Sequence, residues 1–328
     1  MSRTLGVTVR VAVGAAILGC LVWRLGTGPF LDGLHAVSGW SLAAAVLLCA
    51  VTTVCAAWRW TVVARGLGVP LSVRSAIGAS YRAQFLNTVL PGGVLGDVHR
   101  GVRHGRDARD LSKGLRAVAW ERIAGQLVQT LLALTVLCVL PSPLRAAMPV
   151  ILAVLAVIAV LFVIVLRATR HSGAGRIGRW LGIAGSDVRR GLLARATWPR
   201  VVAASVVVVA GHVATFFVAA RAAGVNVPPE RLLPIALVVL LAMAVPASIG
   251  GWGPREGAAA WAFAAAGLGA AQGLAVAIAY GVLVMVSTLP GALLLLASHR
   301  SRRPAPRTAQ PSGAAPRVLA DAGRPVHG

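Results

Sequence analysis

The chain has 328 residues, of which 57% are hydrophobic, and its mean hydropathy is +0.79. A soluble domain needs a polar surface around its core, so this composition excludes an ordinary soluble protein and indicates an integral membrane protein. The formal net charge of +23 would suit a nucleic-acid-binding protein. No binding motif for nucleic acid accompanies that charge, so we do not expect nucleic acid as a partner.

Six apolar runs are long enough to cross a bilayer as helices, which takes about 20 residues for roughly 30 Å of hydrocarbon. They lie at about 7–23, 40–58, 116–140, 146–166, 201–222 and 273–297. Tryptophans near several ends fit an interfacial aromatic belt. Because no alternating strand pattern suggests a barrel, we predict an all-α polytopic membrane protein.

The basic residues follow the predicted topology. With the N-terminus in the cytoplasm, 27 of the 32 Lys and Arg residues fall on the inner side, in the segments 1–10, 59–122, 167–200 and 298–328. This asymmetry is the positive-inside rule, so we predict an N-in, C-in protein of a bacterial-type plasma membrane. Clustered arginines in such loops set the topology and contact anionic phospholipid headgroups. The Pro-, Ala- and Arg-rich tail at 298–328 is expected to be disordered and cytoplasmic.

The N-terminal segment has a second interpretation. Arg3 and Arg10 precede an apolar run that ends in a lipobox-like Ile-Leu-Gly before Cys20, as in a bacterial signal segment. The apolar run continues through Trp23, which favours a first span. The four cysteines, Cys20 included, have neither CxxC nor Cys/His metal spacing, and we expect them to serve packing.

Two apolar segments are broken by glycine and proline. The first, about 75–100, breaks at Pro91-Gly92-Gly93 and Gly96. If it spanned the membrane, the basic stretch 100–113 would fall outside, so a re-entrant hairpin from the inside is favoured. The second, about 231–268, would enter from the outside. Its expected hairpin-forming residues are Pro246, Gly250, Gly251 and Gly253, which permit irregular backbone.

The two hairpins occupy equivalent places in halves of opposite orientation. A transmembrane domain at 1–297 would comprise a first half at about 1–140 and a second half at about 141–297. This is the pattern of an inverted repeat, in which paired broken segments mark a substrate site near the midplane. Eight full spans remain the alternative topology, because 257–297 is long enough for two short helices.

Three ordered blocks resemble a known family. They are Asn87 with Pro91-Gly92-Gly93, Gly96-Asp97 and Arg100, then Glu121-Arg122, and finally Pro246, Gly250-Gly251, Gly253 and Arg255-Glu256. Together they are similar to the conserved blocks of the lysylphosphatidylglycerol synthase transmembrane, or flippase-like, family. The resemblance covers nearly the whole chain up to about residue 297. It implies a lipid-handling membrane domain, here expected without the cytosolic aminoacyl-transferase domain of the fused synthases.

The charged residues near these breaks are the candidate site. A charge at bilayer depth costs about 2.5–3.5 kcal/mol on insertion scales, so such residues are usually paired or functional. Asp97 and Arg100, at i,i+3, can face each other, whereas the neighbours Glu121-Arg122 and Arg255-Glu256 are each expected to find partners on other elements. We expect a cross-hairpin network that binds a lipid headgroup. Its residues are Arg82, Asn87, Asp97, Arg100, Glu121, Arg122, Arg255 and Glu256.

Within that network the arginines would hold a phosphate by bidentate hydrogen bonds, and the carboxylates could hold a cationic headgroup. The alternative is that these are structural ion pairs and turn glycines. His99 and His104 with Asp97 could suggest a metal, but two histidines on a basic surface are more often solvated, so we expect no metal and no cofactor.

Three classes of function follow. The first is a flippase or carrier for an anionic or aminoacylated phospholipid or a polyprenyl-linked lipid. The second is a non-catalytic membrane partner that presents lipid to a separate synthase or glycosyltransferase. The third, an enzyme with Asp97 or Glu121 as general base, is disfavoured because no Ser/His/Asp order, metal set or nucleotide loop is present.

Overall fold

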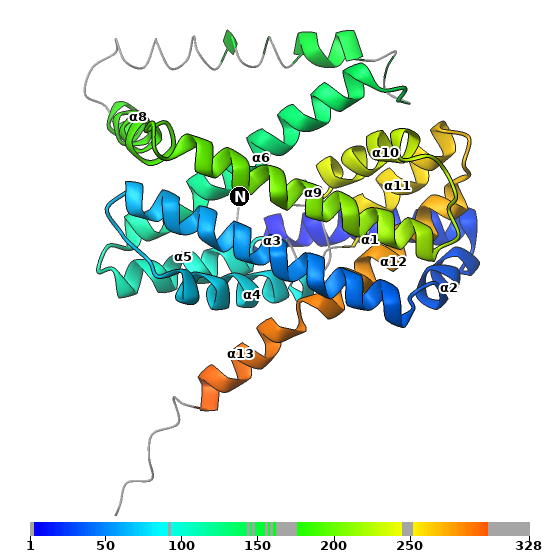
Figure 1. Cartoon of the computed structure of the whole chain (residues 1–328), viewed down its shortest axis with the longest axis horizontal. Coiled ribbons are helices and arrows are strands. Elements are labelled where there is room, and N and C mark those ends of the chain that lie inside the picture. The colour runs from blue at the N-terminus through cyan, green and yellow to red at the C-terminus, as the bar shows by residue number, and fades with distance from the viewer. Residues whose placement is uncertain are drawn as a thin grey trace, which may run out of the picture.

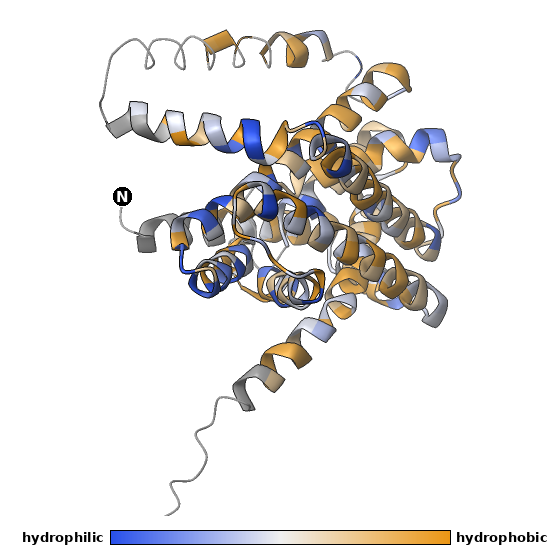
Figure 2. Ribbon diagram, turned by 60° about the vertical axis from the view of Figure 1, so that its left-hand side comes forward, coloured by the Kyte–Doolittle hydropathy of each residue, from blue (hydrophilic) through white to orange (hydrophobic). Residues whose placement is uncertain are grey.

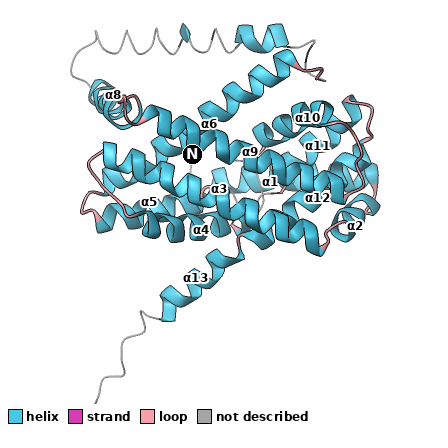
Figure 3. Cartoon of the chain, in the orientation of Figure 1, coloured by secondary structure: helices cyan, strands magenta, loops and turns pink. Residues whose placement is uncertain are grey.

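The computed structural model describes residues 3–90, 93–142, 145, 148–154, 157, 160–161, 176–244 and 252–300. Within these ranges every regular element is a helix, and short loops join the helices (Figure 3). The predicted all-α class is confirmed. The tail at 301–328 lies outside the described residues.

Four helices are long and apolar enough to cross a membrane. They are α3 (Gly39–Gly66), α6 (Leu111–Val139), α9 (Trp198–Ala222) and the helix at Ala270–Ala297. The last consists of α12 (Ala270–Ser287) and most of α13 (Leu289–Arg300). These helices coincide with four of the six predicted spans, and the fourth predicted run, 146–166, lies largely outside the described residues.

The first predicted span is part of a bent pair. Helix α1 (Arg3–Leu25) is followed at once by α2 (Gly28–His35), and the two are bent by 101°. Gly26 at the bend has a φ of 73°, and Pro29 in the first turn of α2 cannot continue the hydrogen bonding of α1. The uninterrupted apolar pattern of this segment did not predict the bend.

Four shorter helices lie between the long ones. Helices α4 (Val73–Val89) and α5 (Leu95–Asp107) lie between α3 and α6, while α10 (Pro229–Ala242) and α11 (Pro254–Ala265) lie between α9 and α12. They contain 12 to 17 residues and are therefore about 18–26 Å long, shorter than a bilayer core. The order long, short, short, long thus occurs twice along the chain.

The short helices form two pairs at opposite ends of the bundle. Helix α4 packs against α5, and α10 packs against α11. In Figure 1, α4 and α5 lie toward the end where α3 finishes, and α10 and α11 lie toward the end where α9 finishes. The chain therefore enters and leaves each helix pair at the same end of the bundle.

A tight turn joins α5 to α6. Asp110 caps α6 by accepting a hydrogen bond from the Lys113 backbone N–H at 3.0 Å, and this bond is the main reason that the pKa of Asp110 is lowered. Gly105 and Gly114 meet backbone to backbone, since a methyl group on Gly114 would overlap the Gly105 Cα. The lack of side chains at these two glycines lets α5 fold back closely on α6.

Helices α3 and α9 pack against each other in opposite directions. A methyl group on Gly66, at the end of α3, would lie 2.8 Å from Gly191 Cα, just before α9, whereas Thr52 lies beside Gly211. Gly191 belongs to a short π-helix, η2 (Val188–Leu192), which follows α8 (Arg176–Asp187). This antiparallel pair joins the two halves of the molecule.

The bundle has two main hydrophobic cores. The first is built around Trp60 and Val63 of α3 with alanines of α4 and α6, and the second around Phe216, Phe263 and Tyr280 of α9, α11 and α12. Large apolar side chains also face outward on the long helices, for example Leu47 at 66% exposure and Leu127 at 58%. Figure 2 shows apolar residues over most of the bundle and polar residues gathered toward one end. Such a surface is that of a multi-pass membrane protein.

Candidate functional site

Five charged side chains from three helices form a cluster near the break between α4 and α5. They are Arg59 of α3, Asp97 and Arg100 of α5, and Glu121 and Arg122 of α6. We call this group the inner ion cluster. It contains three guanidinium groups and two carboxylates, so its formal charge is positive by one unit.

Glu121 lies at the centre of the cluster and is 1% exposed. Its Oε1 accepts hydrogen bonds from Arg59 Nε at 2.9 Å and Nη2 at 2.5 Å. Its Oε2 accepts from Arg100 Nη2 at 2.6 Å. A fourth helix, α9, contributes Ser205, whose Oγ accepts a hydrogen bond from Arg59 Nη1 at 2.8 Å. Both oxygens of this buried carboxylate are therefore satisfied by charge-assisted bonds.

Asp97 connects the cluster to the break in the hairpin. Its Oδ1 accepts from Arg100 Nε at 2.9 Å, while its Oδ2 accepts from Asn87 Nδ2 at 2.9 Å and from Arg122 Nη2. Asn87 Oδ1 in turn accepts from the Gly96 backbone N–H at 2.7 Å. Asn87 thus joins the end of α4 to the first turn of α5, where helix N–H groups need partners.

Glycine permits the close contact at this break. A methyl group on Gly96 would overlap the Ala83 carbonyl oxygen, so α5 can approach α4 here only without a side chain. Gly93 has a φ of 62°. The expected hairpin residues Pro91 and Gly92 lie outside the described residues, as do Pro246, Gly250 and Gly251 of the second break.

The second half carries a separate ion pair at the start of α11, formed by Arg255 and Glu256. Arg255 Nε donates to Glu256 Oε1 at 2.8 Å, and the Gly253 N–H donates to Glu256 Oε2 at 2.6 Å. The guanidinium lies 4.7 Å from the Trp252 ring and 5.7 Å from the Tyr280 ring. We call this the outer ion pair; unlike the inner cluster, it is electrically neutral.

The expectation that Arg255 and Glu256 cannot pair with each other is wrong. Glu256 occupies the third helical position and turns back to cap Gly253, which has a φ of 117°. The carboxylate therefore lies over the helix start, where the long Arg255 side chain can reach it. The matching expectation for Glu121 and Arg122 is confirmed, because each is bonded to partners on other helices.

The expected sites thus divide into three places. Asn87, Asp97, Arg100, Glu121 and Arg122 come together, whereas Arg255 and Glu256 form their own pair. Among the described residues no hydrogen bond joins the two groups, although Tyr280, beside Arg255, contacts His212 Nδ1 at 3.2 Å. Arg82 lies apart from both and lines a cavity between α4 and α5.

Arg59 was not among the predicted site residues. It lies in the stretch Trp58-Arg59-Trp60 at the inner end of an apolar run, and it was counted with the following basic loop. Helix α3 continues to Gly66, so Arg59 is inside the helix and 6% exposed. A lone arginine between two tryptophans, with apolar residues on both sides, was the available signal.

The comparisons with known proteins agree with this architecture. The family model described as the lysylphosphatidylglycerol synthase TM region matches residues 7–291. A search of curated proteins found no match to the chain. A search of solved structures found none either. Residues 7–291 contain the inner ion cluster and the outer ion pair, and the chain belongs to the lysylphosphatidylglycerol synthase transmembrane-region family.

Proposed function

We propose that this protein is a lipid transporter of the flippase type in a bacterial-type plasma membrane. It binds an anionic or aminoacylated phospholipid, or a polyprenyl-linked lipid, between two re-entrant hairpins, α4–α5 and α10–α11. The family supplies the general connection to lipid handling. The charges at the starts of α5 and α11 supply the chemistry.

The hairpin geometry supports this proposal. Each short helix is too short to cross the bilayer alone, and each pair begins and ends at one end of the bundle (Figure 1). The first pair lies at the end with most of the basic residues, which is the cytoplasmic end under the positive-inside rule. The two breaks then approach the midplane from opposite sides, as in transporters with inverted repeats.

The observation that carries the proposal is the surplus positive charge of the inner ion cluster. Arg122 lies eleven residues after the first residue of α6, about 17 Å along that helix. Its side chain is 48% exposed, although it also bonds Asp97. Asp97 occupies only part of the Arg122 guanidinium, and the exposed remainder at that depth favours a second anion beside it. A lipid phosphate would neutralise the cluster and accept the remaining Arg122 donors.

The outer ion pair has the complementary character. Its charges already cancel, and both side chains are nearly fully buried. Glu256 could bind a cationic headgroup, such as an aminoacyl group, only after Arg255 moves away. We infer that this pair opens during transport and closes when the site is empty.

Leaflet exchange in liposomes tests the function. Purified protein is reconstituted with fluorescent phosphatidylglycerol, aminoacylated phosphatidylglycerol or polyprenyl-phosphate lipids, and exchange is measured by the loss of fluorescence after an impermeant quencher is added. We expect exchange above that of empty vesicles for at least one headgroup. Absence of exchange for every headgroup would exclude the flippase and leave the lipid-presenting partner as the better function.

Two variants connect exchange to the ion sites. Asp97→Asn raises the formal charge of the inner ion cluster by one unit, and Glu256→Gln leaves Arg255 without its counter-ion. Both variants should therefore slow exchange. Asp32→Asn and Glu230→Gln remove the same charges at exposed positions and serve as matched controls. Normal exchange in both site variants, at unchanged expression, would return these carboxylates to structural roles.

A further inference from the structure

A cavity of about 270 Å³ lies between α4 and α5, beside the inner ion cluster. Its basic and aromatic lining residues are Trp60 of α3, Arg74 and Arg82 of α4, and Arg100, Arg103 and His104 of α5. We propose that this cavity binds a phosphate group, and that it is the position where an anionic phospholipid headgroup enters from the inner leaflet. The assignment of the phosphate to a lipid rests on the proposed function.

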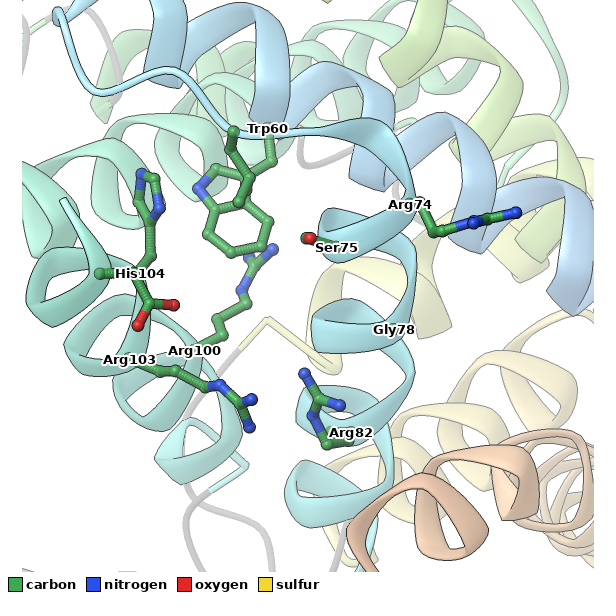
Figure 4. A pocket seen from close by; sticks show the side chains of 10 residues that line it. Trp60, Arg74, Ser75, Gly78, Arg82, Arg100, Arg103 and His104 are labelled. Carbon is green, nitrogen blue, oxygen red and sulfur yellow. The ribbon is translucent and has the colours of Figure 1, made fainter. Parts of the chain in front are cut away.

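The charges of the cavity are unbalanced. Arg82 and Arg103 extend into the gap from opposite helices (Figure 4). Within the described residues neither forms an ion pair with a carboxylate, and each has an intermediate exposure. Asp107 is the one acidic residue in the lining, against four arginines. Two facing guanidinium groups without a counter-ion form a site for an anion with several oxygens.

Buried nitrogen atoms around the same cavity also lack partners. Trp60 Nε1, Arg82 Nε and His104 Nε2 have no hydrogen-bond partner within the part of the chain that the structure describes. Trp60 is 1% exposed and His104 is 4% exposed, and their rings meet edge to face with centroids 5.4 Å apart. Buried polar atoms are normally satisfied, so nitrogen donors of this kind beside a cavity favour a ligand rich in hydrogen-bond acceptors.

Arg100 connects the cavity to the inner ion cluster. Its guanidinium lies 4.8 Å from the Trp60 ring and lines the cavity, while its nitrogens donate to Asp97 and Glu121. An anion in the cavity therefore lies next to the cluster at the hairpin break. This gives a lipid phosphate a continuous series of arginines from the cavity toward Arg122.

The position of the cavity fits the inner leaflet. Leu71, Arg74 and Ser75, at the start of α4, form part of its lining, and Arg74 and Ser75 are exposed. This is the end of the bundle that the positive-inside rule assigns to the cytoplasm. The volume is near the lower limit of about 300 Å³ for ligand pockets, which suits a phosphate and a small headgroup with the acyl chains left outside.

The test measures binding in the full-length protein in detergent. Dihexanoyl-phosphatidylglycerol, dihexanoyl-phosphatidylcholine and inorganic phosphate are titrated separately, and the shift in melting temperature reports binding. We expect the anionic lipid to raise the melting temperature most. Arg82→Gln and Arg103→Gln should each weaken the apparent affinity about tenfold, because each removes a charge-assisted donor.

Arg106→Gln is the matched control, because Arg106 lies on α5 three residues after Arg103 and is exposed. It should respond like the unchanged protein. Arg82→Lys and Arg103→Lys keep the positive charge. If the glutamine variants misfold, binding is measured in these lysine variants instead. A shift with inorganic phosphate alone would support the phosphate site and assign it to free phosphate.

No shift with either phosphate source, or equal shifts in the unchanged and Arg82→Gln/Arg103→Gln proteins, would overturn the proposal. The exchange assay separates this result from the function. Binding at the cavity without leaflet exchange would support the phosphate site and exclude the flippase function. Exchange that persists without binding at the cavity would support the flippase function and exclude the phosphate site.

Discussion

Arg59 of α3 and Glu121 of α6 are 62 positions apart in the chain, yet Arg59 donates two hydrogen bonds to one oxygen of Glu121 in the interior of the bundle. This pair joins the helix before the first hairpin to the helix after it. Arg100, within the hairpin, donates to the other oxygen of the same carboxylate. The Glu121 carboxylate of α6 therefore bonds both to α3 and to the first hairpin.

Adding a positive charge to this cluster should destabilise the protein more than removing one. Glu121→Gln raises the formal charge from one to two positive units and leaves Arg59 and Arg100 without their shared partner, so it should destabilise the protein by about 3–5 kcal/mol. Arg59→Met instead makes the cluster neutral and should cost less. Thermal unfolding in detergent measures both effects.

The double variant provides the control for this prediction. Arg59→Met with Glu121→Gln returns the cluster to one positive unit, so the pair should be more stable than Glu121→Gln alone. If the double variant loses as much stability as the two single variants added together, charge balance does not govern this site.

Asn87 should control the closure of the first hairpin. Asn87→Ala removes the acceptor of the Gly96 N–H and a donor to Asp97, which should cost about 1–3 kcal/mol because a buried N–H loses its partner. Limited proteolysis at the break should become faster. Asn226→Ala removes an exposed hydrogen bond with Arg221 and should change neither stability nor cleavage.

Gly96→Ala should separate α4 from α5. The new methyl group would overlap a backbone carbonyl of α4, and backbone cannot move aside as a side chain can, so a loss of about 1–3 kcal/mol is expected. Gly78→Ala is the matched control on the same hairpin, because its nearest neighbour would be 3.9 Å away. It should be neutral or slightly stabilising in melting temperature.

Labelling of single cysteines should distinguish a re-entrant hairpin from two spans. In a protein without the four free cysteines Cys20, Cys49, Cys55 and Cys138, Asn226→Cys should react with an impermeant maleimide from outside, and Arg74→Cys only from inside. Val94→Cys, at the break, should not react from outside. Labelling of Val94→Cys together with Asn226→Cys would establish that α4 and α5 both cross the membrane, as in the eight-span alternative.

The sequence was sufficient for the long helices because their signal is local. Runs of about 20 apolar residues have few alternatives to a membrane helix, and four such runs became α3, α6, α9 and the helix at 270–297. The broken segments were also predictable, since glycine and proline interrupt helices by backbone chemistry alone. Asp97 and Arg100 could be paired because i,i+3 spacing brings them together.

Contacts that depend on tertiary structure were beyond the sequence. Arg59 looked like the first residue of a basic loop, because hydropathy falls there before the helix ends. The Arg255–Glu256 pair arises from a cap at a glycine with unusual backbone, and neighbours in an ordinary helix do not face each other. The cavity forms because α4 packs closely against α5. The sequence of either helix alone does not predict that packing.

The contact between Gly253 and Gly14 has a consequence for the surroundings of the second hairpin. A methyl group on Gly253 would lie 3.0 Å from Gly14 Cα, so α1 touches the start of α11 backbone to backbone, and Ile17 covers Gly257 one turn later. In a bilayer, α1 then separates the acyl chains from this side of the outer ion pair. In the proposed transporter, lipid tails can reach Arg255 and Glu256 from that side only when α1 itself swings aside.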